Sequence, residues 1–341
     1  MSFATRALNV LLAVLLTAGS AAAADPIADF YRGKTVRIIV GYGEGGGYDL
    51  YARLAALHIG RSIPGDPTVV VQNMPGAGTK IASRYIVNAA PKDGTVLGMV
   101  SQAVAQDFIM EGGKEFDPAK FVWIGRLTTN IDIGVTQRDS PIKTLADATR
   151  REVVIGSLAP GTNSVIAPTL LNAVAGAKFK IIQGYKSSAE VSLAMERGEV
   201  EAIAAIGWAG IKSSRPDWLT GNRINVIYQI ARDRSPELPD ATAFGELGAT
   251  PEDRAAMRFF GSSSDIGRSL FVAPGVPADK VAALRKAFQD MLGDPAFIED
   301  TKRRNLDVAP ATGNKIAEIV AETLATPRAV VERMKAALAP K

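Results

Sequence analysis

A glycine-rich turn between a strand-like and a helix-like segment constrains this chain more than any other feature. Residues 35–40 (TVRIIV) are apolar and β-branched and predict a buried strand, and leucines spaced by helical turns after residue 49 predict a helix. The turn between them, residues 41–49 (GYGEGGGYD), would expose backbone N–H groups at the positive end of the helix dipole. The pattern therefore predicts an anion site on an α/β scaffold.

Similar turns recur along the chain. Strand-like runs alternate with helix-like runs nearly throughout, which favours an α/β fold with mainly parallel sheets. Glycine- or hydroxyl-rich turns follow other predicted strands at residues 73–78, at Ser101 and at residues 156–164. Ligands of open α/β sheets bind outside the carboxyl ends of the strands. Because 341 residues exceed what one growing core accommodates, we expect two lobes with a ligand enclosed between such turns.

The first 24 residues have the pattern of a cleaved signal peptide. Arg6 supplies a positive start, residues 7–18 (ALNVLLAVLLTA) form an apolar core shorter than a membrane span, and residues 22–24 are alanines suited to cleavage. The sequence contains no cysteine, so disulfides and a lipid-modified N-terminal cysteine are excluded. We expect an exported, periplasmic protein that is stabilised by its core alone.

Charge and motif spacing disfavour nucleic acids and dinucleotides as partners. The formal net charge is +4, and Lys and Arg are dispersed without interleaved aromatics, so no nucleic-acid partner is expected. Gly41, Gly43 and Gly46 match the spacing of the dinucleotide fingerprint. However, Glu44 would lie where a pyrophosphate belongs, and the next predicted strand ends in residues 72–73 (QN) without an acidic ribose ligand.

Residues suited to catalysis are sparse. His58 is the lone histidine, so any Ser–His–Asp triad would depend on it, and no Gly-x-Ser-x-Gly elbow occurs. We interpret His58 as structural or superficial, and Asp132, Glu199 and Glu201 as solvated charges. We expect no catalytic residue, no cofactor and no metal. Asp49 at the predicted helix start either caps free N–H groups, or orients the turn or bonds a ligand.

An ordered set of motifs resembles one known family. Residues 43–53 resemble the Pro-Gly-Gly-x-x-Asp-x-x-Ala-Arg signature of tripartite tricarboxylate transporter substrate-binding proteins, also called Bug receptors. Further motifs similar to those of the family are, in order along the chain, residues 73–78 (NMPGAG), 91–94 (PKDG), 184–187 (GYKS), 238–240 (LPD) and 273–277 (APGVP). The resemblance covers nearly the whole chain after residue 24.

This resemblance implies a periplasmic-binding-protein-like fold, with two α/β lobes joined by crossing strands and a ligand cleft between them. We expect lobe 1 to comprise residues 25–128 plus 233–341, and lobe 2 to comprise residues 129–232. The implied function is capture of a small organic carboxylate and its delivery to a permease of one large and one small membrane subunit, by a monomer. The alternatives are a secreted hydrolase or transferase on a two-lobe scaffold, or a ligand sensor for a signalling partner.

The resemblance also implies where the ligand binds. In the family, backbone N–H groups and bridging waters on two opposing turns hold the carboxylate, and here these turns are residues 42–49 and 156–164. The candidate ligand-binding residues are Tyr42, Gly43, Gly46, Gly47, Tyr48, Asp49, Ala77, Gly78, Ser101, Gly161, Thr162, Asn163, Ser164, Tyr185 and Trp208.

Three positions depart from the family pattern. Glu44 replaces a usual proline and adds a negative charge beside the expected anion site. Val165 stands where many relatives carry a histidine, and Ala205 occupies a position that is often acidic. These differences bear on the ligand more than on the fold. If Glu44 pointed inward, it would penalise a second carboxylate or favour a ligand that carries a cation.

Overall fold

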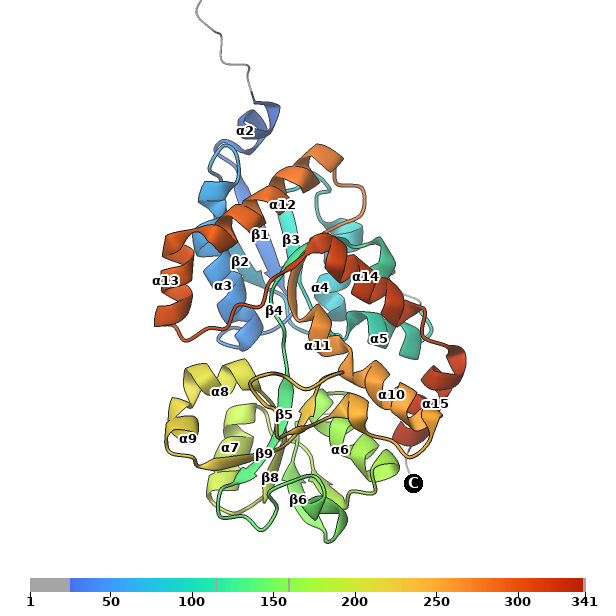
Figure 1. Ribbon diagram of the computed structural model, residues 1–341. Helices are drawn as coiled ribbons and strands as arrows, with labels where there is room; N and C mark the ends of the chain where they lie inside the picture. The colour runs from blue at the N-terminus through green and yellow to red at the C-terminus, as the bar shows by residue number, and fades with distance from the viewer. Residues whose placement is uncertain (1–24, 114–115, 159, 340–341) are drawn as a thin grey trace, which may run out of the picture.

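The computed structural model describes residues 25–113, 116–158 and 160–339, which form two lobes joined by crossing segments (Figure 1). We call the part built on the first sheet lobe 1 and the part built on the second sheet lobe 2. The predicted signal peptide, residues 1–24, lies outside the described residues. No helix in the described ranges combines the length and apolar character needed to cross a membrane.

Lobe 1 is built on a six-stranded sheet. Its strands are β1 (Thr35–Val40), β2 (Thr68–Asn73), β3 (Val96–Met99), β4 (Val122–Thr128), β11 (Arg268–Val272) and β12 (Ala311–Thr312). They lie in the order β12, β4, β11, β3, β1 and β2. The accompanying helices are α2 (Pro26–Tyr31), α3 (Gly47–Ile59), α4 (Lys80–Arg84), α5 (Val104–Met110), α11 (Ser263–Ile266), α12 (Ala278–Gly293), α13 (Pro295–Arg303) and α14 (Gly313–Leu324).

Lobe 2 has a six-stranded sheet of its own. Its strands are β5 (Asp132–Gln137), β6 (Val153–Gly156), β7 (Phe179–Ile182), β8 (Ala202–Gly207), β9 (Ile224–Ile230) and β10 (Thr242–Ala243). They lie in the order β10, β9, β5, β8, β6 and β7. The accompanying helices are α6 (Asn163–Val174), α7 (Ser188–Glu196), α8 (Trp208–Ser214), α9 (Pro216–Thr220), α10 (Pro251–Gly261) and α15 (Arg328–Leu338).

Both sheets are mixed, so the expectation of mainly parallel sheets is wrong. β1 is parallel to β2 and β3, and β6 is parallel to β7 and β8. The crossing strands differ, because β11 is antiparallel to β3 and β4, and β5 is antiparallel to β8 and β9. β5 begins at the junction directly after β4 and runs away from it, whereas β6 and β8 run toward it. A strand that enters a lobe from the junction must therefore oppose its neighbours.

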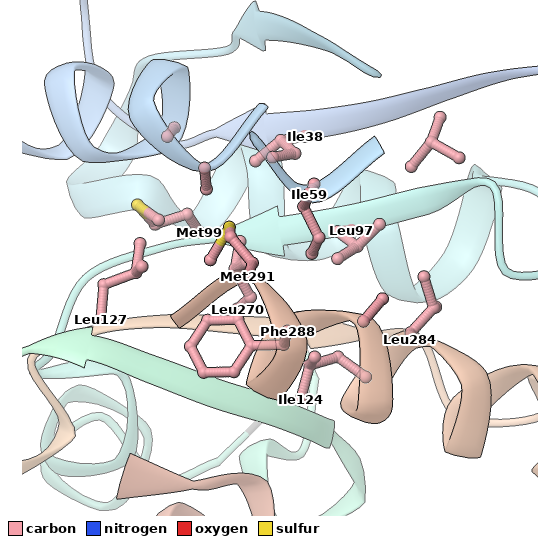
Figure 2. Close-up of a cluster of buried hydrophobic side chains, with 14 of the residues drawn as sticks. Ile38, Ile59, Leu97, Met99, Ile124, Leu127, Leu270, Leu284, Phe288 and Met291 are labelled. Carbon is pink, nitrogen blue, oxygen red and sulfur yellow. The ribbon is translucent and has the colours of Figure 1, made fainter. Parts of the chain in front are cut away.

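The core of lobe 1 joins the sheet to its C-terminal helices. Figure 2 shows Leu284 and Phe288 of α12 beside Ile124 of β4 and Leu270 of β11. All four side chains are at most 2% exposed, and Val281 is buried in the same cluster. The helical spacing of Val281, Leu284 and Phe288 thus places one face of α12 in the core. Phe288 and its neighbours thereby pack α12 against β4, the strand after which the chain crosses to lobe 2.

Two C-terminal elements pack on lobe 2. Phe259 of α10 and Met334 of α15 share a buried cluster with Leu170 of α6 and Tyr228 of β9, and Figure 1 places both helices beside the lower lobe. β10 also pairs with β9 in the second sheet. These elements lie outside residues 129–232, the range expected for lobe 2, and the lobe boundaries stay a prediction.

Candidate functional site

The glycine turn precedes α3 at the carboxyl end of β1, and Asp49 holds it in shape. Asp49 is 3% exposed, and its carboxylate accepts hydrogen bonds from Gly45 N and Arg53 Nε, each at 2.9 Å. Asn73 Nδ2 at the end of β2 donates to the same carboxylate at 2.9 Å. Burial alone would raise the pKa of Asp49, but these hydrogen bonds hold it below its usual value. Asp49 is thus an ionised residue that orients the turn.

We expect Asp49→Ala to lower the free energy of unfolding by about 2–4 kcal/mol, because it leaves three donors without their acceptor. The change should also weaken ligand binding at the glycine turn, since Gly45 N loses the hydrogen bond that fixes its position. Urea denaturation measures the first effect and calorimetric titration the second.

The matched control is Asp147→Ala in lobe 2, where the carboxylate accepts from Lys143 N and Thr144 N at 3.0 Å in a solvated loop. It should cost less stability than Asp49→Ala, because water replaces the lost acceptor in the loop, and it should leave ligand affinity unchanged. Equal losses of stability in the two variants would contradict the role assigned to Asp49.

Glu44 points to solvent. Its side chain is 80% exposed, and Arg53 Nη2 lies 3.9 Å from its Oε1. An ion pair between such exposed groups contributes little to stability. Because the carboxylate of Glu44 is hydrated and next to a positive charge, it places no buried negative charge in the glycine turn.

Two tyrosines form an aromatic wall at the start of α3. Tyr42 and Tyr48 stack with ring centroids 4.3 Å apart and an interplanar angle of 26°. The Tyr48 hydroxyl accepts a hydrogen bond from Gln102 N at 3.1 Å. Burial raises the pKa of Tyr42 to about 12 and that of Tyr48 well above its usual value, so both phenols stay neutral. The wall is therefore uncharged.

Thr79 joins three of the predicted turns, which sequence reasoning missed. Ala77, Gly78 and Thr79 have consecutive positive φ angles of 47°, 62° and 74°, which are rare for a β-branched residue such as threonine. Ser101 N donates to Thr79 Oγ1 at 3.1 Å. A Cβ at Gly41 would lie only 2.5 Å from Thr79 Cβ. Thr79 thus packs the turn of residues 73–78 against the glycine turn and against Ser101.

The second-lobe turn is closed by Ser164. Thr162 is the N-cap of α6, and no side chain in the described part of the chain caps that helix start. Ser164 is buried, and its Oγ accepts from Leu158 N at 2.9 Å and from Ser157 Oγ at 3.0 Å. The Ser164 hydroxyl is therefore engaged within the turn, whereas α6 presents its first N–H groups at the end of β6.

Asp132 lies at the junction between the lobes. It begins β5, is half-buried, and accepts a hydrogen bond from Asn163 Nδ2 at 2.9 Å. Burial raises the pKa of Asp132, against the opposing effects of Asn163 and the nearby charge of Arg268. The carboxylate is also near enough to Tyr42 to contribute to the raised pKa of that phenol. The interpretation of Asp132 as a solvated charge is thus wrong.

The predicted site residues differ in exposure. The exposed ones are Gly43, Gly46, Ala77, Gly78 and Gly161; the half-buried ones are Tyr42, Gly47, Thr162, Asn163, Tyr185 and Trp208; the buried ones are Tyr48, Asp49, Ser101 and Ser164. Tyr185 packs within lobe 2, with its ring 3.5 Å from where a Cβ on Gly156 would lie. Trp208 N donates to the crossing segment at Ile131 O at 2.9 Å, and Trp208 Nε1 donates to Glu237 Oε2 at 2.5 Å. Their role as ligand walls stays a prediction.

Arg268, the first residue of β11, was missed by sequence reasoning. It is 4% exposed, and its Cζ lies 4.7 Å from the ring centroid of Tyr51 and 5.5 Å from that of Tyr48. A Cβ on Gly47 would lie 2.5 Å from Arg268 Nη2. The guanidinium therefore lies against the first turn of α3. The sequence offers one weak signal, a charge directly before the apolar run of β11, and no hint of its distant partner.

His58 is structural, as predicted. It lies at the far end of α3 from the glycine turn and is buried. Arg61 Nη2 donates to His58 Nδ1 at 2.6 Å, so the opposite nitrogen Nε2 donates to Asp300 Oδ2 at 3.1 Å. Within the described ranges, no cluster of three or more His, Cys, Asp or Glu side chains is suited to hold a metal ion.

Two α/β lobes, crossing strands and helix starts directed at the junction define a two-lobe solute-binding protein. The chain belongs to the tripartite tricarboxylate transporter family receptor group, TctC, whose family model matches residues 52–336. This confirms the resemblance and the periplasmic-binding-protein-like fold.

Individual relatives agree with this assignment. A UPF0065 protein of Cupriavidus necator is 26% identical, with 90% of this chain and 89% of the relative covered. A TctC solute-binding protein from Polaromonas has a TM-score of 0.64 at 21% identity, covering 89% of this chain and 99% of that one. MatC from Rhodopseudomonas palustris with bound malate has a TM-score of 0.63 at 19% identity, covering 90% and 99%. These two structures support the fold.

Proposed function

We propose that this protein is a periplasmic receptor that captures a small organic carboxylate between its lobes and delivers it to a tripartite tricarboxylate-type permease. Membership of the TctC receptor family supports this function. The observation that carries it is a pair of helix starts, those of α3 in lobe 1 and α6 in lobe 2. Each follows a turn at the carboxyl end of a strand, and no described side chain caps either one.

The two helix starts account for binding without chemistry on the ligand. α3 has 13 residues and α6 has 12, so each presents free N–H groups and a full helix dipole to an anion. Charge-assisted hydrogen bonds from backbone N–H groups to a carboxylate are short and strong. A carboxylate that contacts both lobes favours the closed state, because the contacts to both exist only there.

The proposed first-lobe contacts are the backbone from Gly46 to Tyr48, and the proposed second-lobe contacts are the backbone and side chains from Thr162 to Ser164. MatC, a neighbour of similar fold, is described with bound malate, which supports a carboxylate as the ligand class. Export by the predicted signal peptide, a monomeric state and delivery to large and small permease subunits belong to the same proposal. A sensor role would be favoured instead if the gene had no permease pair beside it.

The function is tested by a panel of mono-, di- and tricarboxylates in a thermal unfolding assay. At 100 times its Kd, a bound acid should stabilise the protein by about 2.7 kcal/mol and raise the Tm by several degrees. ATP and NAD serve as anionic controls and should leave the Tm unchanged. If a nucleotide raised the Tm and no carboxylate did, the proposed function would be wrong.

A further inference from the structure

Arg268 has a buried guanidinium whose hydrogen-bond donors are unmatched. Its Nε and Nη1 are buried, and neither has a hydrogen-bond partner within the part of the chain that the structure describes. The rings of Tyr48 and Tyr51 lie beside the cation and attract it, but a ring face is no substitute for an oxygen acceptor. Burying a charge without a partner is costly, so an anion that reached these donors would bind favourably.

A neighbouring arginine shows that a guanidinium in this part of the sheet can find hydrogen-bond acceptors within the protein. Arg126 on β4, the strand that pairs with β11, donates from Nε to Ala309 O at 3.0 Å and from Nη1 to Asp265 O. Burial lowers the pKa of Arg126, yet its donors have backbone acceptors. Burial near β11 alone therefore does not explain why Nε and Nη1 of Arg268 lack acceptors.

The unmatched donors lie at one end of the proposed ligand site. A Cβ on Gly47, the first residue of α3, would lie 2.5 Å from Arg268 Nη2 and 3.4 Å from the unmatched Nε. The guanidinium and the first N–H groups of α3 are therefore neighbours, although they come from distant parts of the sequence. Together they provide a positive charge and several donors for one anionic group.

Acceptors lie around the same place. Asp132 begins β5 four residues after Thr128, the residue of β4 that pairs with Arg268, so the charge of Arg268 acts on Asp132, but no ion pair joins them within the described structure. Asn163 Nδ2 is its one hydrogen-bond donor among the described residues. Gln102, whose backbone N–H donates to the Tyr48 hydroxyl, has a buried side-chain Oε1 without a partner among the same residues. A ligand group that reaches either acceptor must therefore donate a hydrogen bond to it.

We propose that Arg268 is a ligand-binding residue that pairs its guanidinium with the ligand's carboxylate, and that Asp132 accepts a hydrogen bond from a hydroxyl or ammonium group beside that carboxylate. This rests on the proposed function and narrows the ligand to carboxylates that carry a hydrogen-bond donor. A plain second carboxylate at Asp132 would meet a like charge. Malate and aspartate should therefore bind more tightly than succinate, which has the same carbon chain without the hydroxyl or ammonium group.

The experiment is calorimetric titration of the unmodified protein and matched variants with malate, in both enantiomers, aspartate and succinate. We expect the best donor-bearing acid to bind at least about 10-fold more tightly than succinate, and Asp132→Asn to reduce that preference. Malate against aspartate decides between a hydroxyl and an ammonium donor. Arg268→Met should weaken binding of the best acid by about 10- to 150-fold.

Arg126→Met is the matched control and should leave the Kd unchanged. The Tm of the ligand-free proteins provides a second readout, since an arginine whose role is only structural would stabilise the ligand-free fold. The Tm of ligand-free Arg268→Met should stay unchanged or rise, whereas Arg126→Met should lower it through the loss of matched hydrogen bonds.

The outcomes distinguish failure of the role assigned to Arg268 from failure of the proposed function. If the unmodified protein binds none of these acids or those of the wider panel, the proposed function fails and this inference fails with it. If it binds them and Arg268→Met binds equally well, the proposed function stands and the role of Arg268 is overturned. Should that variant not fold, a crystal structure of the unmodified protein with the best acid decides. A carboxylate oxygen within about 3 Å of Arg268 Nε or Nη1 supports the role, and a carboxylate placed elsewhere overturns it.

Discussion

Asp300→Asn is expected to lower the free energy of unfolding by about 1–3 kcal/mol, the range for leaving a buried hydrogen-bonding group without its partner. Asp300 is 3% exposed and accepts hydrogen bonds from His58 Nε2 at 3.1 Å and from Arg304 Nε at 2.9 Å. Arg303 also donates to this carboxylate. The neutral amide would leave the imidazole of His58 and the two guanidinium groups facing a poorer acceptor between α3 and α13.

The pH dependence of this loss gives a second test. The hydrogen bond from Arg304, opposed by burial and aided by His58, lowers the pKa of Asp300 from 3.8 to about 2. A lowered carboxyl pKa stabilises the fold above the unfolded-state value, and that contribution is lost as the pH falls toward the folded-state value. The stability difference between the unmodified protein and Asp300→Asn should thus be constant from pH 7 to about pH 4 and shrink toward pH 2.

Guanidinium denaturation at a series of pH values measures both effects. The control is Asp290→Asn on α12, where an exposed carboxylate pairs with Lys286 Nζ at 2.6 Å across one helical turn. That pair should contribute only about 0.3–0.5 kcal/mol. A loss at Asp300 as small as the control's, or one independent of pH down to 2, would contradict the structural role of this cluster. Carboxylate binding should survive in both variants, because His58 and Asp300 lie away from the glycine turn.

Local patterns were sufficient to predict the elements whose neighbours in sequence determine them. The strand at residues 35–40 and the helix after it appear as β1 and α3, because apolar periodicity and the glycine turn act within a few residues. The buried face of α12 follows from helical spacing in the same way. By contrast, the alanine-rich strand β8 was not foreseen, because alanine has little intrinsic strand preference. β8 forms between β5 and β6, where sheet pairing outweighs that preference.

The site was less predictable from the sequence than the fold. The glycines of residues 41–49 located the turn that contains Asp49, but they left two roles open for Asp49. The hydrogen bonds from Asn73 and Arg53 decide between these roles. Arg268 and Asp132 looked like ordinary charges in the sequence. Their importance comes from the crossing strands, which bring the first residues of β5 and β11 to the lobe junction. Sequence spacing carries no information about that approach.

Gly47→Ala is expected to weaken carboxylate binding by about 10- to 150-fold while leaving the protein folded. Gly47 is the first residue of α3 and does not have a positive φ, so alanine suits its backbone and is the better helix former. The added Cβ would lie 2.5 Å from Arg268 Nη2 and 3.2 Å from its Cζ. The guanidinium must then move from the place where it and the helix start act on the same anion.

Gly43→Ala is the matched control within the same turn, because Gly43 lies outside the proposed first-lobe contacts, the backbone from Gly46 to Tyr48. A Cβ on Gly43 would have no atom within 4 Å, and Gly43 also lacks a positive φ. Calorimetric titration with the best carboxylate should therefore give an unchanged Kd for Gly43→Ala and a much larger Kd for Gly47→Ala, at similar Tm for the free proteins. Equal Kd values would mean that the ligand does not use the space between α3 and Arg268. Equal losses in both variants would instead show that the whole turn requires glycine, whatever the position of the guanidinium.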